Sequence, residues 1–106
     1  MKTIMLVCSA GMSTSLLVSK MEKAALSKNF ESKIFAVSSS EADSKINSEN
    51  PDIILLGPQV RFMLEDFKSK VKQKNIPVSV IDMRDYGVMN GEKVLNDTIL
   101  LMENHS

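Results

Sequence analysis

Four short apolar runs punctuate the chain, separated by longer segments of mixed polarity. They cover residues 4–7, 34–37, 53–56 and 78–81. The first and third runs are continuous rather than alternating, which is typical of strands that are buried on both faces of a parallel sheet. We therefore predict one strand at each run.

The segments between and after these runs have helical spacing of their apolar residues. The second segment is the weakest, because only Ala42 and Ile46 form a narrow stripe, although Ser38 and Glu41 have the spacing of a capping box. The dipeptide Asn90-Gly91 predicts a turn before the last helix. The stronger apolar faces are Leu17, Met21, Ala24 and Ala25; then Val60, Met63, Leu64, Phe67 and Val71; then Val94, Leu95, Thr98, Leu101 and Met102.

Strands and helices thus alternate along the whole chain. This order predicts an α/β fold with right-handed crossovers between parallel strands. We predict one open four-stranded parallel sheet of order 2-1-3-4, with helices on both faces, and a single domain over residues 1–106. In this order a crevice opens at the carboxyl end of the first strand, where such sheets bind ligands.

Composition and net charge exclude several classes of partner and of cellular location. The 106 residues include 13 Lys plus Arg and 13 Asp plus Glu, so the net charge is zero and nucleic acid is not expected as a partner. A single cysteine excludes an internal disulfide and indicates a reducing compartment. No signal-peptide pattern and no run long enough to cross a bilayer is present. We expect a cytoplasmic protein that is not inserted in a membrane and reaches any membrane process through a partner.

Cys8 stands at the end of the first predicted strand, just before a predicted helix. Backbone N–H groups at a helix N-terminus stabilise a thiolate, or a phosphate carried on it. The commonest role of a lone intracellular cysteine is that of a small buried apolar residue, but such a role does not require so many small polar neighbours. The predicted phosphate cradle is Ser9, Ala10, Gly11, Met12, Ser13, Thr14 and Ser15.

Three functions are compatible with this loop. A cysteine phosphatase requires an arginine after five intervening residues, and Thr14 occupies that position. The acidic residues Asp82 and Asp85 follow a strand but lie in no obvious general-acid motif. Slow hydrolysis of a bound phosphoryl group suits a phosphoryl relay instead. The third possibility is a binding module whose cysteine is inert.

Other residues complete the predicted site. Gln59 follows Gly57-Pro58 and would begin a helix beside the cysteine loop, where its amide can donate to a phosphate oxygen. Tyr86, predicted in a loop after the fourth strand, borders the site, and Met12 is a candidate exposed docking residue. We expect no metal site, because one cysteine and one histidine do not suffice, and no nucleotide or other cofactor.

Three segments of the chain resemble one protein family. They are residues 8–18 (CSAGMSTSLLV), residues 52–60 (DIILLGPQV), and Asp82 with Tyr86-Gly87. They are similar, at matching spacing, to the IIB components of the bacterial phosphotransferase system, lactose/cellobiose (chitobiose) family. The first segment resembles the phosphocysteine loop of that family.

The resemblance implies a fold like that of low-molecular-weight tyrosine phosphatases and an activity as a phosphotransferase. It implies that Cys8 accepts phosphate from a phosphohistidine of the IIA component. The group then passes to a sugar held by the membrane IIC component, during uptake of cellobiose, diacetylchitobiose or another β-glucoside. The alternative from the hydrolase class is a degenerate low-molecular-weight-type phosphatase in which Thr14 replaces the arginine.

Overall fold

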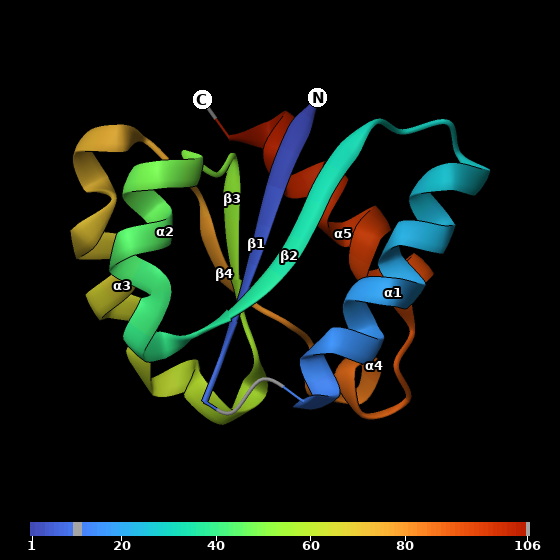
Figure 1. Ribbon diagram of the computed structural model, residues 1–106, viewed down its shortest axis with the longest axis horizontal. Helices are drawn as coiled ribbons and strands as arrows, with labels where there is room; N and C mark the ends of the chain where they lie inside the picture. Colours follow the sequence, from blue (N-terminus) through green and yellow to red (C-terminus); the bar gives the residue numbers. More distant parts are fainter. Residues whose placement is uncertain (10–11, 106) are drawn as a thin grey trace.

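A central sheet is covered by helices on both faces in the computed structural model, which describes residues 1–9 and 12–105 (Figure 1). The sheet has four parallel strands in the order β2-β1-β3-β4, which confirms the predicted fold class and strand order. The strands are β1 (Lys2–Cys8), β2 (Ser32–Ser38), β3 (Ile53–Leu56) and β4 (Val78–Val80).

The helices form two layers. Figure 1 shows α1 and α5 on one face of the sheet and α2 and α3 on the other. A short helix, α4, follows β4 and precedes α5. The α-helices are α1 (Met12–Ser27), α2 (Ala42–Glu49), α3 (Leu64–Lys70), α4 (Met83–Gly87) and α5 (Gly91–Asn104), and the 3-10 helices are η1 (Ser39–Glu41), η2 (Pro58–Met63) and η3 (Lys72–Lys74).

The central strand β1 supplies side chains to both hydrophobic layers. Ile4 and Leu6 pack with α1 and α5, whereas Met5 and Val7 pack with α2 and α3. All four side chains are fully buried, and each contributes about 1.5–3 kcal/mol relative to an exposed side chain. Burial on both faces explains why this run is continuous in the sequence.

The strands end together at one edge of the sheet. Cys8 is paired with Ser38 of β2, and Leu56 of β3 is paired with Val80 of β4. The backbone N–H of Gly57 donates to the Val7 carbonyl at 2.8 Å, which keeps the end of β3 against the end of β1. The segments that leave these strands therefore meet at this carboxyl edge, at the bottom of Figure 1.

The predicted third helix is interrupted. Residues 58–63 form the 3-10 helix η2, in which Val60 has a non-helical backbone (φ −116°, ψ 23°), and α3 begins only at Leu64. Val60 and Phe67 are nonetheless both buried on the same layer, as their spacing predicts. The prediction of one continuous helix was wrong, because burial of Val60 next to Pro58 is achieved with a tighter, irregular turn.

Two sequence patterns that were expected near the starts of helices, a capping box and a turn, differ in the structure. The Ser38 hydroxyl lies 3.2 Å from the Glu41 carboxylate and caps no backbone N–H, so the predicted capping box does not form. Asn90-Gly91 is not a separate turn: Asn90 is the N-cap of α5, and its side chain accepts from the Lys93 N–H at 3.0 Å.

Candidate active site

Cys8 is the last residue of β1 and is 4% exposed. Its thiol donates to the backbone carbonyl of Val37 in β2, with a sulfur-to-oxygen distance of 3.6 Å. Helix α1 begins four residues later, at Met12. The sulfur therefore lies at the end of the central strand, close in sequence to a helix N-terminus.

Thr14 and Tyr86 join the first turn of α1 to α4. Their hydroxyl oxygens are 3.3 Å apart, and both residues are buried. Thr14 is the residue at the position where a cysteine phosphatase requires arginine. In this chain the Thr14 side chain contacts the hydroxyl group of Tyr86, so this position carries a hydroxyl group where a phosphatase carries a guanidinium.

Gly57 brings Gln59 and Tyr86 together at the carboxyl edge. A Cβ atom at Gly57 would lie 3.2 Å from the Gln59 Oε1 atom, 3.4 Å from the Val7 carbonyl oxygen and 3.9 Å from a Tyr86 ring carbon. The absence of a side chain thus lets the Gln59 amide fold back over the end of β3. The prediction that Gln59 begins a helix here is met by η2, where Gln59 is exposed.

The rest of the predicted cradle is partly outside the described residues. Ser9 and Ser15 are exposed, and Ser9 follows Cys8 directly. Ala10 and Gly11 lie outside the described residues, as does the predicted exposure of the Met12 side chain. Ser13 contributes its backbone to the first turn of α1. Their role in binding phosphate stays a prediction.

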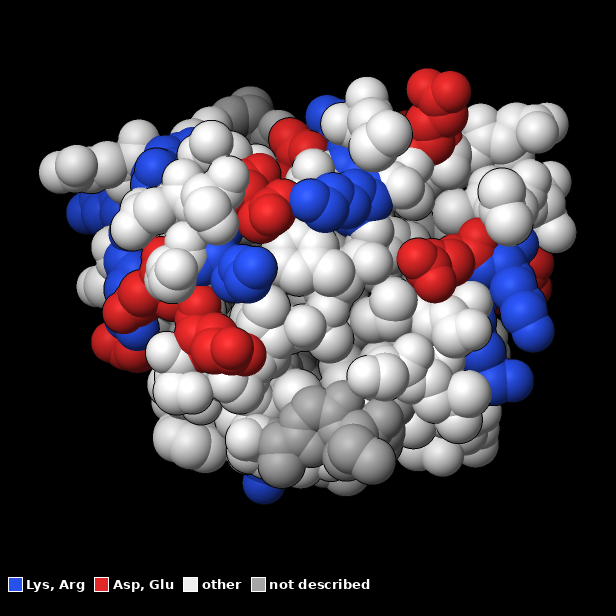
Figure 2. All heavy atoms as spheres, in the orientation of Figure 1, with Lys and Arg blue, Asp and Glu red and all other residues white. Residues whose placement is uncertain are grey.

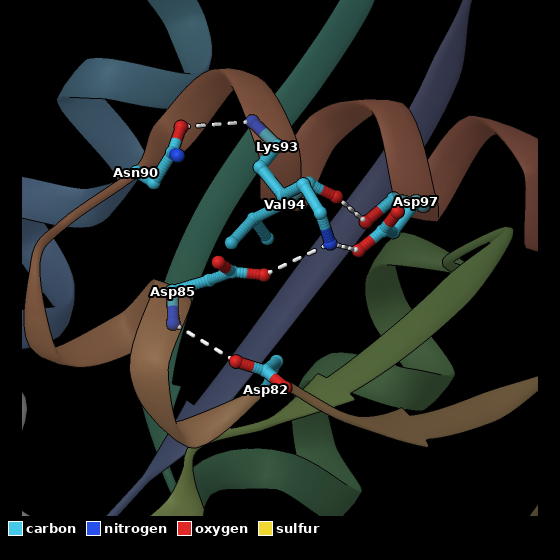
Figure 3. Close-up of polar contacts among 7 residues, drawn as sticks. Asp82, Asp85, Asn90, Lys93, Val94 and Asp97 are labelled. Carbon is cyan, nitrogen blue, oxygen red and sulfur yellow. Dashed lines mark hydrogen bonds and ion pairs between the residues drawn. The ribbon is translucent and has the colours of Figure 1, made fainter.

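Tyr86 lies in the short helix α4 rather than in the predicted loop. Asp82 is the N-cap of this helix, and its side chain accepts from the Asp85 N–H at 3.0 Å. Figure 3 shows the Asp85 carboxylate directed at Lys93, whose Nζ atom lies 3.2 Å from Asp85 and 2.9 Å from Asp97. These two carboxylates, Asp97 foremost, raise the pKa of Lys93 above its usual value. Asp82 and Asp85 thus have structural partners.

The carboxyl edge carries little charge on the face seen in Figure 2. Charged side chains gather in the upper and middle parts of this view, and most of the described side chains in the lower part are uncharged. Exposed apolar side chains lie in the elements that leave this edge, namely Leu16 in α1, Phe62 in η2 and Met83 in α4.

A cavity of about 430 Å³ lies elsewhere, between β4 and α5. Asp82, Asp85 and Thr98 are among its lining residues, and Cys8 is not.

Comparison with known proteins decides the family. A family model described as the lactose/cellobiose-specific IIB subunit of the PTS system matches residues 3–97. The chain belongs to this IIB family.

Relatives within the family differ in their sugar. The chain is 50% identical over 97 residues to a galactose-specific EIIB component of Lactococcus lactis subsp. cremoris (strain MG1363), with 89% of this chain and 90% of the relative covered. The same values describe a cellobiose-specific EIIB component of Lactococcus lactis subsp. lactis (strain IL1403). Equal identity to proteins named for two sugars shows that overall identity does not select the sugar.

A solved structure supports the same assignment. The solution structure of a cellobiose-specific IIB component from Borrelia burgdorferi is 43% identical and has a TM-score of 0.78. The match covers 99% of this chain and 94% of that one. The IIB fold is the predicted fold like that of low-molecular-weight phosphatases.

The described residues of the IIB chain contain neither a membrane-spanning helix nor a cluster of metal-binding side chains. Among residues 1–9 and 12–105, no helix is long and apolar enough to span a bilayer. In the same part of the chain, no group of three or more His, Cys, Asp or Glu side chains is placed to hold a metal ion.

Two contacts next to predicted site residues were not predicted from the sequence: the pairing of Lys93 with Asp85, and the close packing around Gly57. The Lys93–Asp97 pair has helical i,i+4 spacing and was readable from the sequence. The pair of Lys93 with Asp85 crosses the turn between α4 and α5, so no periodicity signals it. Gly57 reads as a strand stop, and only the three-dimensional packing shows what its missing side chain accommodates.

The Asp82 cap makes α4 sensitive to acid. The N–H of Asp85, with help from that of Arg84, lowers the pKa of Asp82 below its ordinary value. The cap therefore stabilises the fold fully above the ordinary Asp pKa of about 3.9, and this contribution is lost as the pH falls through the lowered pKa. We expect the Asp85 and Tyr86 amide NMR signals to shift below about pH 4.

Asp82→Asn is the matched control, because asparagine is also a good N-cap but does not titrate. The acid-induced shifts should be much smaller in this variant. Shifts of equal size in Asp82→Asn and the wild type would assign them to another carboxyl group.

Proposed function

We propose that this IIB chain is a phosphocarrier in which Cys8 accepts a phosphoryl group from a phosphohistidine of a IIA component and passes it to a sugar held by a membrane IIC component. The observation that supports it most is the place of Cys8 at the end of the central strand, shortly before the N-terminus of a 16-residue helix. Residues 1–106 act as one domain in this proposal. It works in the cytoplasm and associates peripherally with the transporter.

The first transfer is a displacement at phosphorus. The thiol loses its proton to water, the sulfur attacks phosphorus, and the P–N bond of phosphohistidine breaks with its electron pair remaining on the imidazole, which then takes up a proton from water. In this proposal the backbone N–H groups of residues 9–15 donate hydrogen bonds to the phosphoryl oxygens and stabilise their negative charge. In the second transfer a sugar hydroxyl attacks phosphorus and loses its proton, and the S–P bond breaks with its electron pair remaining on the Cys8 sulfur as a thiolate.

The Thr14–Tyr86 contact supports transfer rather than hydrolysis. A phosphatase places a guanidinium beside the phosphoryl group and thereby stabilises charge in the transition state. Here a buried neutral pair of hydroxyl groups occupies the corresponding position. A carrier needs the phosphocysteine to outlast the encounter with its acceptor, so the missing cation favours the relay.

The proposed sugar is a β-glucoside such as cellobiose or diacetylchitobiose. Support comes from the family description and from the relatives named for cellobiose. Since this domain presents phosphate to a sugar bound by IIC, the choice of sugar lies in that membrane partner. The assignment is tested by measuring transfer of the phosphoryl group from the phosphorylated chain to one sugar at a time, in vesicles that contain the matching IIC component.

The experiment for the carrier function uses phosphorylated IIA from a lactose/cellobiose-family system. Incubation should add one phosphate to the intact mass of the chain, and the phosphate should be lost when IIC vesicles and sugar are added. Turnover of p-nitrophenyl phosphate by the chain, with no uptake from IIA, would instead support the phosphatase. Slow alkylation of Cys8 and no uptake would support an inert binding module.

Phosphorylation should order the cradle and leave the sheet unchanged. A phosphate on Cys8 would collect several backbone amides into charge-assisted hydrogen bonds. Amide NMR shifts on phosphorylation should concentrate between Cys8 and Leu16, with a smaller group near Gln59. Shifts spread evenly along the chain, or absent from residues 8–16, would contradict the cradle.

A further inference from the structure

Lys93 links α5 to α4 through a mostly buried carboxylate. Its ammonium group lies 3.2 Å from the carboxylate of Asp85, whose side chain is 12% exposed, while the Lys93 side chain is 54% exposed. The second partner, Asp97, lies on the same helix as Lys93 and is therefore unable to join two elements (Figure 3). Asp85 is the partner that connects the helices.

Two buried residues hold α4 in place: Tyr86, which packs in the hydrophobic core, and Asp85, which makes polar contacts. The Asp85 N–H donates to Asp82, its carbonyl accepts from the Asn90 N–H at 2.9 Å, and its carboxylate meets Lys93. A helix of five residues has no independent stability in water, so such contacts fix its position. The next residue, Tyr86, carries the hydroxyl that meets Thr14.

We propose that Lys93 is a positioning residue for the phosphoryl relay, which holds Asp85 and thereby keeps the Tyr86 hydroxyl against Thr14 at the end of the cradle. This inference rests on the proposed function of Cys8. The ammonium contacts two carboxylates and is not assigned a contact with the phosphoryl group. It acts through α4.

The effect follows from burial. Without the ammonium, the Asp85 carboxylate is left largely buried and has no cation beside it, which is costly. The carboxylate then moves toward water and takes α4 with it, so that the Tyr86 hydroxyl withdraws from Thr14. Because transfer rates depend steeply on the placement of groups around phosphorus, phosphoryl uptake should fall about tenfold.

The main test compares Lys93→Met with two other variants. Lys93→Met keeps the apolar stem and removes the charge, Lys93→Arg restores a cation, and Asp97→Asn removes only the partner on the same helix. Uptake from phosphorylated IIA should fall in Lys93→Met and recover in large part in Lys93→Arg. The rate of phosphoryl uptake by Asp97→Asn should remain within about twofold of the wild-type rate.

A double variant identifies the route. If Lys93 acts through the Tyr86 hydroxyl, Lys93→Met combined with Tyr86→Phe should be no slower than Tyr86→Phe alone. Losses that multiply in the double variant would overturn the route through Tyr86. Uptake by Lys93→Met at the wild-type level would overturn the proposal itself.

A second readout does not depend on phosphate. In the unphosphorylated protein, the NMR signals of the Tyr86 ring and the Thr14 methyl group should shift in Lys93→Met and stay in place in Asp97→Asn. Unchanged signals in Lys93→Met would overturn the positioning role. If the wild-type chain takes up no phosphate but Lys93→Met still shows these shifts, the proposed function is overturned. The contact between α4 and the cradle then remains established.

Discussion

Phosphoryl uptake from phosphorylated IIA falls by at least about a thousandfold when Cys8 is replaced by serine, because a serine hydroxyl is a far weaker nucleophile than a thiolate. The fold should survive. Cys8 lies beside the Val37 carbonyl, which can accept a hydrogen bond from the serine hydroxyl as it does from the thiol. The intact mass of Cys8→Ser after incubation with the donor measures the loss.

The control for this variant is its thermal unfolding. A melting temperature within a few degrees of the wild type would assign the loss of uptake to the missing sulfur. Uptake by Cys8→Ser at the wild-type rate would exclude Cys8 as the acceptor and would redirect attention to another residue of the chain.

Among the described glycines, Gly91→Ala should cause the largest loss of stability, about 3 kcal/mol in the free energy of unfolding. A Cβ atom at Gly91 would lie 2.5 Å from the Lys20 carbonyl carbon and 2.7 Å from the Met21 nitrogen. These are backbone atoms of α1, so no side chain can rotate away. The helices α1 and α5 would have to separate, and α1 carries the end of the cradle.

Gly87→Ala is the matched control for this prediction. A Cβ atom at Gly87 meets nothing within 4 Å, and no described glycine has a positive φ. The substitution should therefore be neutral or stabilise by up to about 1 kcal/mol. Urea unfolding of the two variants measures the contrast, and a Gly91→Ala protein as stable as Gly87→Ala would contradict the close approach of the helices.

The sheet could be predicted from the sequence because its strands contain uninterrupted runs of apolar residues. Strand β3 covers the same residues as the predicted run, 53–56, since all four of its side chains are buried and none interrupts the apolar pattern. Strands β1 and β2 extend further, to include polar ends such as Ser38 that pair along the backbone without being buried. Pairing of the backbone leaves no trace in the apolar pattern.

The parts of the site that escaped prediction depend on contacts between distant elements. Tyr86 was expected in a loop, but it lies in a short helix that is stabilised by the Asp82 cap, by the pairing of Lys93 with Asp85 and by burial of Tyr86 itself. Gly91 looked like a turn residue, whereas its role is to let α5 approach Lys20 of α1. Such roles are set by packing across the fold and have no local signature.

The most direct test of the account is to map the phosphorylated residue. The chain is incubated with phosphorylated IIA under conditions that preserve labile phosphates and then fragmented in a mass spectrometer. The account predicts one phosphate, on Cys8. A phosphate on His105, the single histidine of the chain, or on one of the serines around Cys8, would contradict it.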